Sequence, residues 1–283
     1  MSIRSARYNL LQLRRPKSNN MQIIELYGWA FCAAASTTGQ VGIRDSREQK
    51  ATIGLVKDLR NARLYEKMKA VYPFVGATAT THMFNLIDPR NENSAFRLSF
   101  SGGWTHNSTG AAGNGTNAWA NTNLNAFNNL TNGDFSISAY VVTGSVNSQN
   151  YTGEINCNAN PYNPAGLIGL RVFNRAIGLA QFNGGDDRTE SAAASSTTMG
   201  FAVGSETSNS NRKFYKNNSL LATNTTTSTT ALQNGNLWLM WGGYEFALSK
   251  LAFVHAGSSL TDSQASTLYT IVQRYQTALG RQV

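Results

Sequence analysis

The most informative segment for the fold is Arg212-Lys213-Phe214-Tyr215-Lys216-Asn217-Asn218-Ser219-Leu220-Leu221-Ala222, in which an Asn-Asn pair separates two short alternating runs. Alternation with a period of two predicts strands, and asparagine tolerates the positive φ angles that a tight turn requires. The stretch therefore predicts a β-hairpin. Two further strands are predicted downstream, at 237–241 and 246–254, separated by Gly242-Gly243.

A helix is predicted after these strands, over residues 261–280. Thr261 and Gln264 have the spacing of a capping box, and Gly280 is a typical helix end. Apolar side chains recur at helical spacing between them, at Leu268, Ile271, Val272, Tyr275 and Leu279.

Upstream of the hairpin, the chain is rich in Gly, Asn, Ser and Thr and contains many short apolar runs. Strands are predicted at 96–100, 135–142, 167–173, 177–182 and 197–203, among others, and the total is about ten to twelve. Strands in this number, with polar turns every 8–12 residues, predict an antiparallel two-sheet sandwich.

Several motifs of this chain resemble a known group of proteins. The hairpin 214–218, the strands 239–242 and 251–254, and the segment 259–264 resemble the closing section of laminin-G-like or concanavalin A-like jelly rolls, although Asn218 stands where those proteins usually have Gly. Together with four upstream runs, they resemble bacteriophage virion and tail structural proteins with a laminin-G-like sandwich. These runs are 64–76, 81–89, 95–106 and 113–120.

The resemblance covers about residues 45–283 and implies a non-enzymatic structural protein of a phage virion, displayed as a capsid decoration or as a tail or fibre component. It implies assembly in the host bacterial cytoplasm, contacts with other virion proteins and homo-oligomers. The alternative is a carbohydrate-binding adhesin that recognises host surface glycans. A glycan-cleaving enzyme is a third hypothesis. No pair of strand carboxylates with glycosidase spacing is present, so we expect no enzymatic activity.

Charge divides the chain into a basic first quarter and a nearly neutral remainder. Residues 1–70 hold 13 Lys and Arg against 5 Asp and Glu, whereas residues 71–283 hold 11 against 10. We expect a docking segment at 1–44, a helical segment at 45–76 and a sandwich at 77–283. Within the second segment, a capped helix starts at Asp45 or Ser46, and a short helix is predicted from Leu64 to Ala70.

The docking segment combines a basic arm with a short apolar helix at 21–35. Its cations are Arg4, Arg7, Arg14, Arg15 and Lys17. A basic arm suits an acidic partner, and a solvated surface is the alternative. The arm has almost no interleaved aromatic residues, so we expect no specific nucleic-acid recognition. No run of about 18 apolar residues predicts a membrane span.

Aromatic residues near predicted turns are the candidate glycan-binding residues, because flat rings stack on the apolar faces of sugars. They are Trp104, Trp119, Tyr151, Tyr162 and Tyr244. The alternative is that they fill the core. Asp186, Asp187 and Glu190 follow a Gly-Gly pair and are candidate Ca²⁺ ligands, the alternative being a solvated hairpin tip. No other cofactor is predicted. The three histidines could bind a metal ion if folding brought them together.

Overall fold

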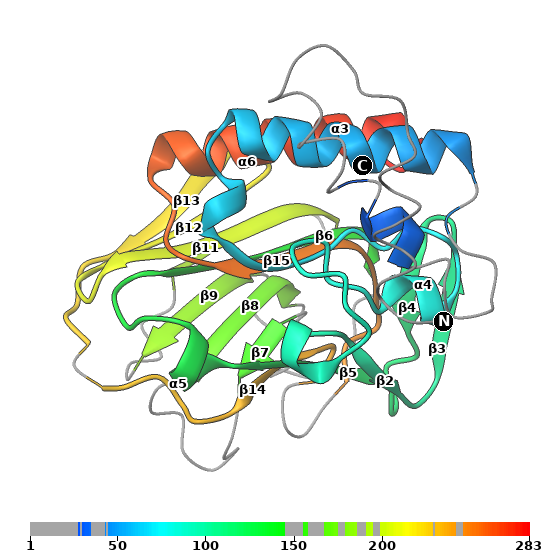
Figure 1. Cartoon of the computed structure of the whole chain (residues 1–283). Coiled ribbons are helices and arrows are strands. Elements are labelled where there is room, and N and C mark those ends of the chain that lie inside the picture. The colour runs from blue at the N-terminus through cyan, green and yellow to red at the C-terminus, as the bar shows by residue number, and fades with distance from the viewer. Residues whose placement is uncertain are drawn as a thin grey trace.

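The computed structural model describes residues 28, 30–34, 43, 45–144, 155–157, 167–174, 179–185, 191–194, 199–228, 230–241 and 246–283. Two antiparallel sheets face each other, and two long helices lie over the outer side of one of them (Figure 1). The predicted antiparallel sandwich with a C-terminal helix is therefore confirmed. None of the described helices is long and apolar enough to cross a bilayer.

Sheet A, the sheet under the helices, has the strand order β13-β12-β11-β6-β15-β4-β3, and β1 also pairs with β15. Its strands are β1 (Met68–Tyr72), β3 (Trp104–Asn107), β4 (Gly110–Gly113), β6 (Phe135–Gly144), β11 (Gly200–Ser208), β12 (Asn211–Lys216), β13 (Ser219–Asn224) and β15 (Ser249–Gly257).

Sheet B has the order β10-β9-β8-β7-β14-β5-β2. Its strands are β2 (Ser99–Ser101), β5 (Trp119–Asn125), β7 (Ile155–Cys157), β8 (Leu167–Asn174), β9 (Leu179–Gly185), β10 (Ser191–Ala194) and β14 (Asn236–Leu239). The helices are α3 (Ser46–Asn61), α4 (Ala79–His82), α5 (Ala126–Asn129) and α6 (Asp262–Ala278), with 3-10 turns η1 (Tyr65–Lys67) and η2 (Asn93–Ala95).

The hairpin and the last helix form as their local sequences predict. β12 and β13 pair across Asn217 and Asn218, whose φ angles are 46° and 69°. The side chain of Thr261 accepts a hydrogen bond from the backbone N–H of Gln264, and the Gln264 side chain accepts one from the backbone N–H of Thr261. Gly280 has φ 68° just after α6, a conformation that glycine adopts without strain.

The sandwich has two hydrophobic cores because both faces of sheet A are covered. Phe135, Ile137 and Ala139 of β6 point into the core between the sheets. Tyr140, on the opposite face of the same strand, packs under α3 and α6. Every residue from Phe135 to Val141 is buried as a result. Fully burying one large apolar side chain contributes about 1.5–3 kcal/mol.

One prediction about local structure is wrong. The helix predicted from Leu64 to Ala70 ends at Lys67, and β1 follows it because Val71 and Tyr72 pair with His255 and Val254 of β15. The two strands predicted after residue 236 meet at an isolated antiparallel bridge between Trp241 and Phe246 and otherwise lie in different sheets. β14 pairs with β5 and β7 in sheet B, whereas β15 lies in sheet A.

Part of the expected docking segment belongs to the core. Gly28 and residues 30–34 are helical, and Phe31, Cys32 and Ile43 are 1%, 2% and 1% exposed among side chains of α3 and α6. The burial raises the pKa of the Cys32 thiol to about 12, so this thiol is protonated. Docking through residues 1–44 stays a prediction for the part of that segment that the structure does not describe, which includes residues 1–27.

Candidate functional site

The outer face of sheet B carries a row of polar and aromatic side chains on strands β5 and β14. Along β5, Trp119, Asn121, Asn123 and Asn125 are partly exposed, while the residues between them are buried. β14 continues the pattern with Asn236 and Trp238 outward. The two long helices lie on the other side of the molecule, over sheet A (Figure 1). We call this row, together with Trp241, the Trp–Asn face.

Three tryptophans form one end of the Trp–Asn face. The ring centroids of Trp119 and Trp238 are 5.0 Å apart, those of Trp238 and Trp241 are 5.1 Å apart, and both pairs are nearly perpendicular. Trp119 and Trp241 are 6.3 Å apart at 37°. Such edge-to-face contacts hold each ring in a fixed orientation. All three side chains remain partly exposed, so each keeps some indole surface for a ligand.

The asparagines of the Trp–Asn face are held by hydrogen bonds to one another and to the backbone. The backbone N–H of Asn123 and the Nδ2 of Asn236 both donate to Oδ1 of Asn121, at 2.8 and 3.0 Å. The backbone donor fixes which end of the Asn121 amide is oxygen, so its NH₂ end is a preset donor on this face.

The neighbouring amides are fixed in the same way. Nδ2 of Asn123 donates to the backbone carbonyl of Arg97 at 2.6 Å, and Asn123 itself has φ 57° at an irregularity in the β5–β14 register. Nδ2 of Asn125 donates to Oδ1 of Asn234 at 2.8 Å. Because these bonds set the side-chain orientations before any ligand arrives, binding would cost little further ordering.

The strands that carry the Trp–Asn face have no charge. β2, β5, β7 and β14 contain no Asp, Glu, Lys or Arg. Arg97 precedes β2, and its guanidinium donates to Oδ1 of Asn91 and of Asn93 at 2.7 and 2.9 Å. The face therefore offers amides and aromatic rings to a ligand rather than ionic groups.

Of the predicted glycan-binding residues, the structure brings Trp104 and Trp119 together. Nε1 of Trp104 donates to the backbone carbonyl of Trp119 at 3.0 Å. The ring of Trp104, however, packs on Phe100 and His106 at the border of the core between the sheets, so the core alternative suits this residue. Tyr151, Tyr162 and Tyr244 lie outside the described residues.

The other predicted site residues are also outside the described part of the chain. They are the candidate calcium ligands Asp186, Asp187 and Glu190 and the arm cations Arg4, Arg7, Arg14, Arg15 and Lys17. Among the residues that are described, no group of three His, Cys, Asp or Glu side chains is placed to hold a metal ion.

Two of the three histidines do meet. Nδ1 of His82 and Nδ1 of His106 are 2.9 Å apart, so one ring donates and the other accepts. The pKa of His82 lies well below its ordinary value, mainly because the ring is buried and to a smaller extent because His106 and Arg281 are nearby. Burial also lowers the pKa of His106, to about 4. Both rings are therefore neutral at pH 7.

His255 lies apart from this pair in a buried hydrogen-bond chain. The hydroxyl of Ser136 donates to the carbonyl of Ser258 at 2.7 Å and so accepts from Nε2–H of His255 at 3.0 Å. Nδ1 of His255 then accepts from Ser138 at 2.5 Å. His255 and both serines are 0% exposed, so no substrate reaches this Ser-His arrangement and its role is structural.

Trp238, Trp241 and the asparagine row were not among the site residues predicted from the sequence. The signal that identifies them is the alternation of Trp119-Ala120-Asn121-Thr122-Asn123-Leu124-Asn125. Every second residue is Trp or Asn, and the residues between them are small or apolar. Polar alternation is usually attributed to solvation, and the juxtaposition with Trp238 requires the pairing of β5 with β14.

No protein-family model matches the chain, and no curated protein matches it in sequence. Similar solved structures include a mutant of Trypanosoma rangeli sialidase that displays trans-sialidase activity, with a TM-score of 0.52 and 10% identity over 80% of this chain and 39% of that chain. The binding domain of botulinum neurotoxin DC in complex with SialylT has a TM-score of 0.50 and 14% identity, covering 74% of this chain and 52% of that one.

A third similar structure comes from botulinum neurotoxin type C, whose cell entry depends on interaction with two ganglioside molecules. Its TM-score is 0.51 at 14% identity, over 75% of this chain and 53% of that chain. The chain thus spans about two-fifths to half of the length of these three proteins. At such identities the likeness shows a shared β-sandwich fold.

Proposed function

We propose that this protein is a carbohydrate-binding protein that holds a glycan on the Trp–Asn face. The observation that carries the proposal is the combination of partly exposed indoles with a fixed row of amides on uncharged strands. A sugar ring has apolar C–H faces that stack on indole, and its hydroxyls both donate and accept, as the amide of asparagine does. Two similar structures support this reading, one from a toxin whose cell entry depends on gangliosides and one of a toxin binding domain in complex with SialylT.

The experiment is a glycan array followed by calorimetry of any bound glycan, with the whole chain and its variants. We expect Trp238→Ala to weaken binding by about 30-fold, because truncating a central aromatic contact typically costs about 2 kcal/mol. Trp238→Phe keeps an aromatic face and should retain most of the affinity. Leu220→Ala, at a 48% exposed residue on β13, is the control for an unrelated surface change. A blank array, or equal affinity for Trp238→Ala and the unaltered protein, would refute the proposal.

Display on a phage particle remains the second candidate function, and it is compatible with glycan binding. It is supported by the resemblance to virion proteins and by the concentration of positive charge before residue 71. In this proposal the protein is non-enzymatic, residues 1–27 contact other virion proteins, and the sandwich faces outward toward the host. Antibody labelling of intact particles, viewed by electron microscopy, tests it. Absence of label from particles whose lysate contains the protein would contradict it.

A further inference from the structure

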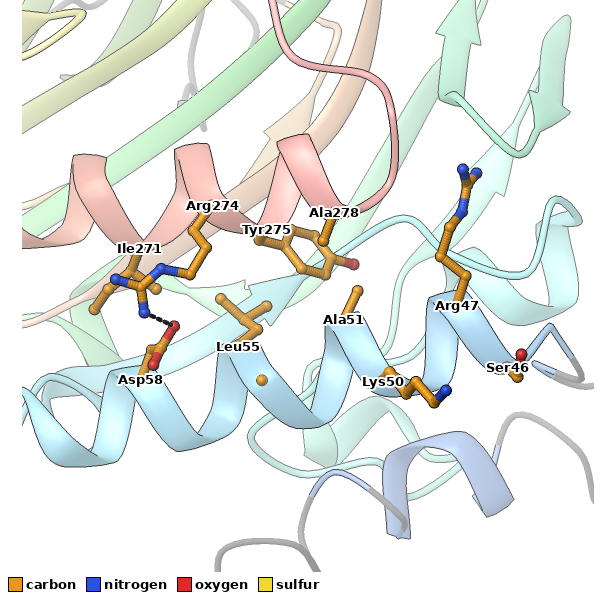
Figure 2. Close-up of a pocket in the computed structure, with 11 residues that line it drawn as sticks. Ser46, Arg47, Lys50, Ala51, Leu55, Asp58, Ile271, Arg274, Tyr275 and Ala278 are labelled. Carbon is orange, nitrogen blue, oxygen red and sulfur yellow. Dashed lines mark hydrogen bonds and ion pairs between the residues drawn. The ribbon is translucent and has the colours of Figure 1, made fainter.

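A groove between α3 and α6 lies on the side of the molecule opposite the Trp–Asn face. The helices run antiparallel, because Arg274 of α6 contacts Asp58 near the end of α3, and Arg47 at the start of α3 reaches toward Gly280. Figure 2 shows the side chains that line the groove. Its cavity volume is about 380 Å³.

Small residues create the groove, and apolar residues form its floor. Leu55, Ile271 and Tyr275 are buried to 2%, 5% and 3% exposure along the contact of the two helices. Gly54 supplies the space above them, because a Cβ on this glycine would meet no atom within 4 Å. Glycine in a helix interior is unfavourable by roughly 0.5–1 kcal/mol relative to alanine, so an open position here has a cost that a ligand site would explain.

The rim of the groove is positively charged. Arg47, Lys50 and Arg274 line it together with one carboxylate, Asp58. Asp58 is neutralised by Arg274, with Nη1 and Oδ2 2.8 Å apart. Arg47 and Lys50 are exposed, and neither forms an ion pair with the described residues. The groove thus combines an apolar floor with two exposed cations that form no ion pair within the described part of the chain.

We propose that this groove receives an acidic amphipathic helix of a partner protein. Apolar side chains at i, i+3, i+4 and i+7 of such a helix would lie on the floor beside Gly54, and Asp or Glu on its flanks would pair with Arg47 and Lys50. The partner would then hold the molecule from its helical side and leave the Trp–Asn face directed away from it.

Charge argues against the two other occupants. The first 27 residues of the chain carry Arg4, Arg7, Arg14, Arg15 and Lys17 with a single acid, Glu25, and would place cations on cations. A second copy that docked through the same groove would also place cations against cations, because both rims would carry Arg47 and Lys50. Like-charge contact of this kind disfavours association.

The test uses a display library of amphipathic helical peptides, selected for binding to the full-length protein. We expect the selected peptides to be net acidic and to lose about tenfold or more in affinity for Gly54→Phe, whose ring fills the groove. Gly54→Ala adds only the Cβ and is the matched control. Arg47→Glu with Lys50→Glu should weaken the same peptides to a similar extent, and added salt should weaken their binding to the unaltered protein.

Several results would overturn the proposal. These are failure of any peptide to be enriched, enrichment of neutral or basic peptides, and equal binding of acidic peptides to Gly54→Phe and Gly54→Ala. Two further measurements test the other occupants. One is the binding of a synthetic peptide of residues 1–27, and the other is self-association in ultracentrifugation. If either occurs and Gly54→Phe abolishes it, the groove has that occupant and the proposal is overturned. Thermal unfolding of each variant confirms that the variant is folded.

Discussion

A buried arginine near the carboxyl end is predicted to be a main stabiliser of the fold. Arg281 is 3% exposed, and its guanidinium donates to four acceptors. Nη1 donates to the carbonyl of Phe74 at 2.8 Å, and Nη2 donates to the carbonyls of Pro73 and Ala252 at 2.8 and 2.9 Å. Nε donates to Oε1 of Gln276 at 2.6 Å. These bonds tie the end of the chain to β15 and to the segment after β1.

The cost of Arg281→Leu follows from the acceptors that lose a donor. The carbonyl of Pro73 keeps the hydroxyl of Tyr275 at 3.1 Å, and that of Ala252 keeps Nε2 of Gln276 at 3.3 Å. Phe74 and Gln276 Oε1 lose their donor, at about 1–3 kcal/mol for each buried unsatisfied acceptor. Burial also lowers the pKa of Arg281, so removing the charge recovers some desolvation energy. We expect a net loss of about 2–4 kcal/mol in the free energy of unfolding, below the sum for the two acceptors because of that recovery.

Urea unfolding followed by tryptophan fluorescence measures this loss, provided that the slope with denaturant is unchanged. Arg274→Leu is the matched control. That side chain is 66% exposed and pairs with Asp58, so its removal should cost less than about 1 kcal/mol. If Arg281→Leu costs no more than Arg274→Leu, the reasoning from buried acceptors is wrong.

Three further predictions concern His255, Gly54 and Gly102. Burial lowers the pKa of His255 from 6.5 to about 3, so below pH 6.5 the unfolded chain binds a proton that the folded chain does not. The contribution of neutral His255 to the free energy of unfolding is therefore present above pH 6.5 and is lost as the pH is lowered. Between pH 6.5 and 5.0 the free energy of unfolding should decrease by up to about 2 kcal/mol more in the unaltered protein than in His255→Gln. Parallel pH–stability curves in urea would contradict this. Gly54→Ala should raise stability by up to about 1 kcal/mol, since the helix has room for the methyl group. Gly102→Ala should lower it by at least about 2 kcal/mol, because φ is +77° and the new Cβ would stand 1.9 Å from the Asn117 carbonyl. Thermal unfolding compares the two alanine variants, and equal shifts would contradict both.

Elements with a strong local signal were predictable from the sequence. The Asn217-Asn218 turn and the Thr261–Gln264 capping box depend on contacts within a few residues, so the sequence pattern alone predicts them. The helix predicted through Ala70 failed for the opposite reason. Met68–Tyr72 lies opposite residues 254–257 of β15, and these distant backbone hydrogen bonds outweigh a weak local preference for helix.

The Trp–Asn face was half predictable. Alternation in Trp119–Asn125 places the indole and the amides on one side of a strand, and this follows from strand geometry alone. Which strand lies beside them does not follow. The adjacent β14 starts 111 residues after β5 ends, and its assignment to sheet B rather than to the sheet of its neighbour β15 puts Trp238 against Trp119.

The antiparallel sandwich, its hairpin and its last helix could be predicted from the residue pattern, because periodicity and capping act over short distances. Three features became visible only in the folded chain: β1 joins sheet A, Phe31 and Cys32 enter the core, and Gly54 lines a groove beside α6. Each of these depends on which distant surfaces meet, and burial and backbone pairing between such surfaces leave little trace in local sequence.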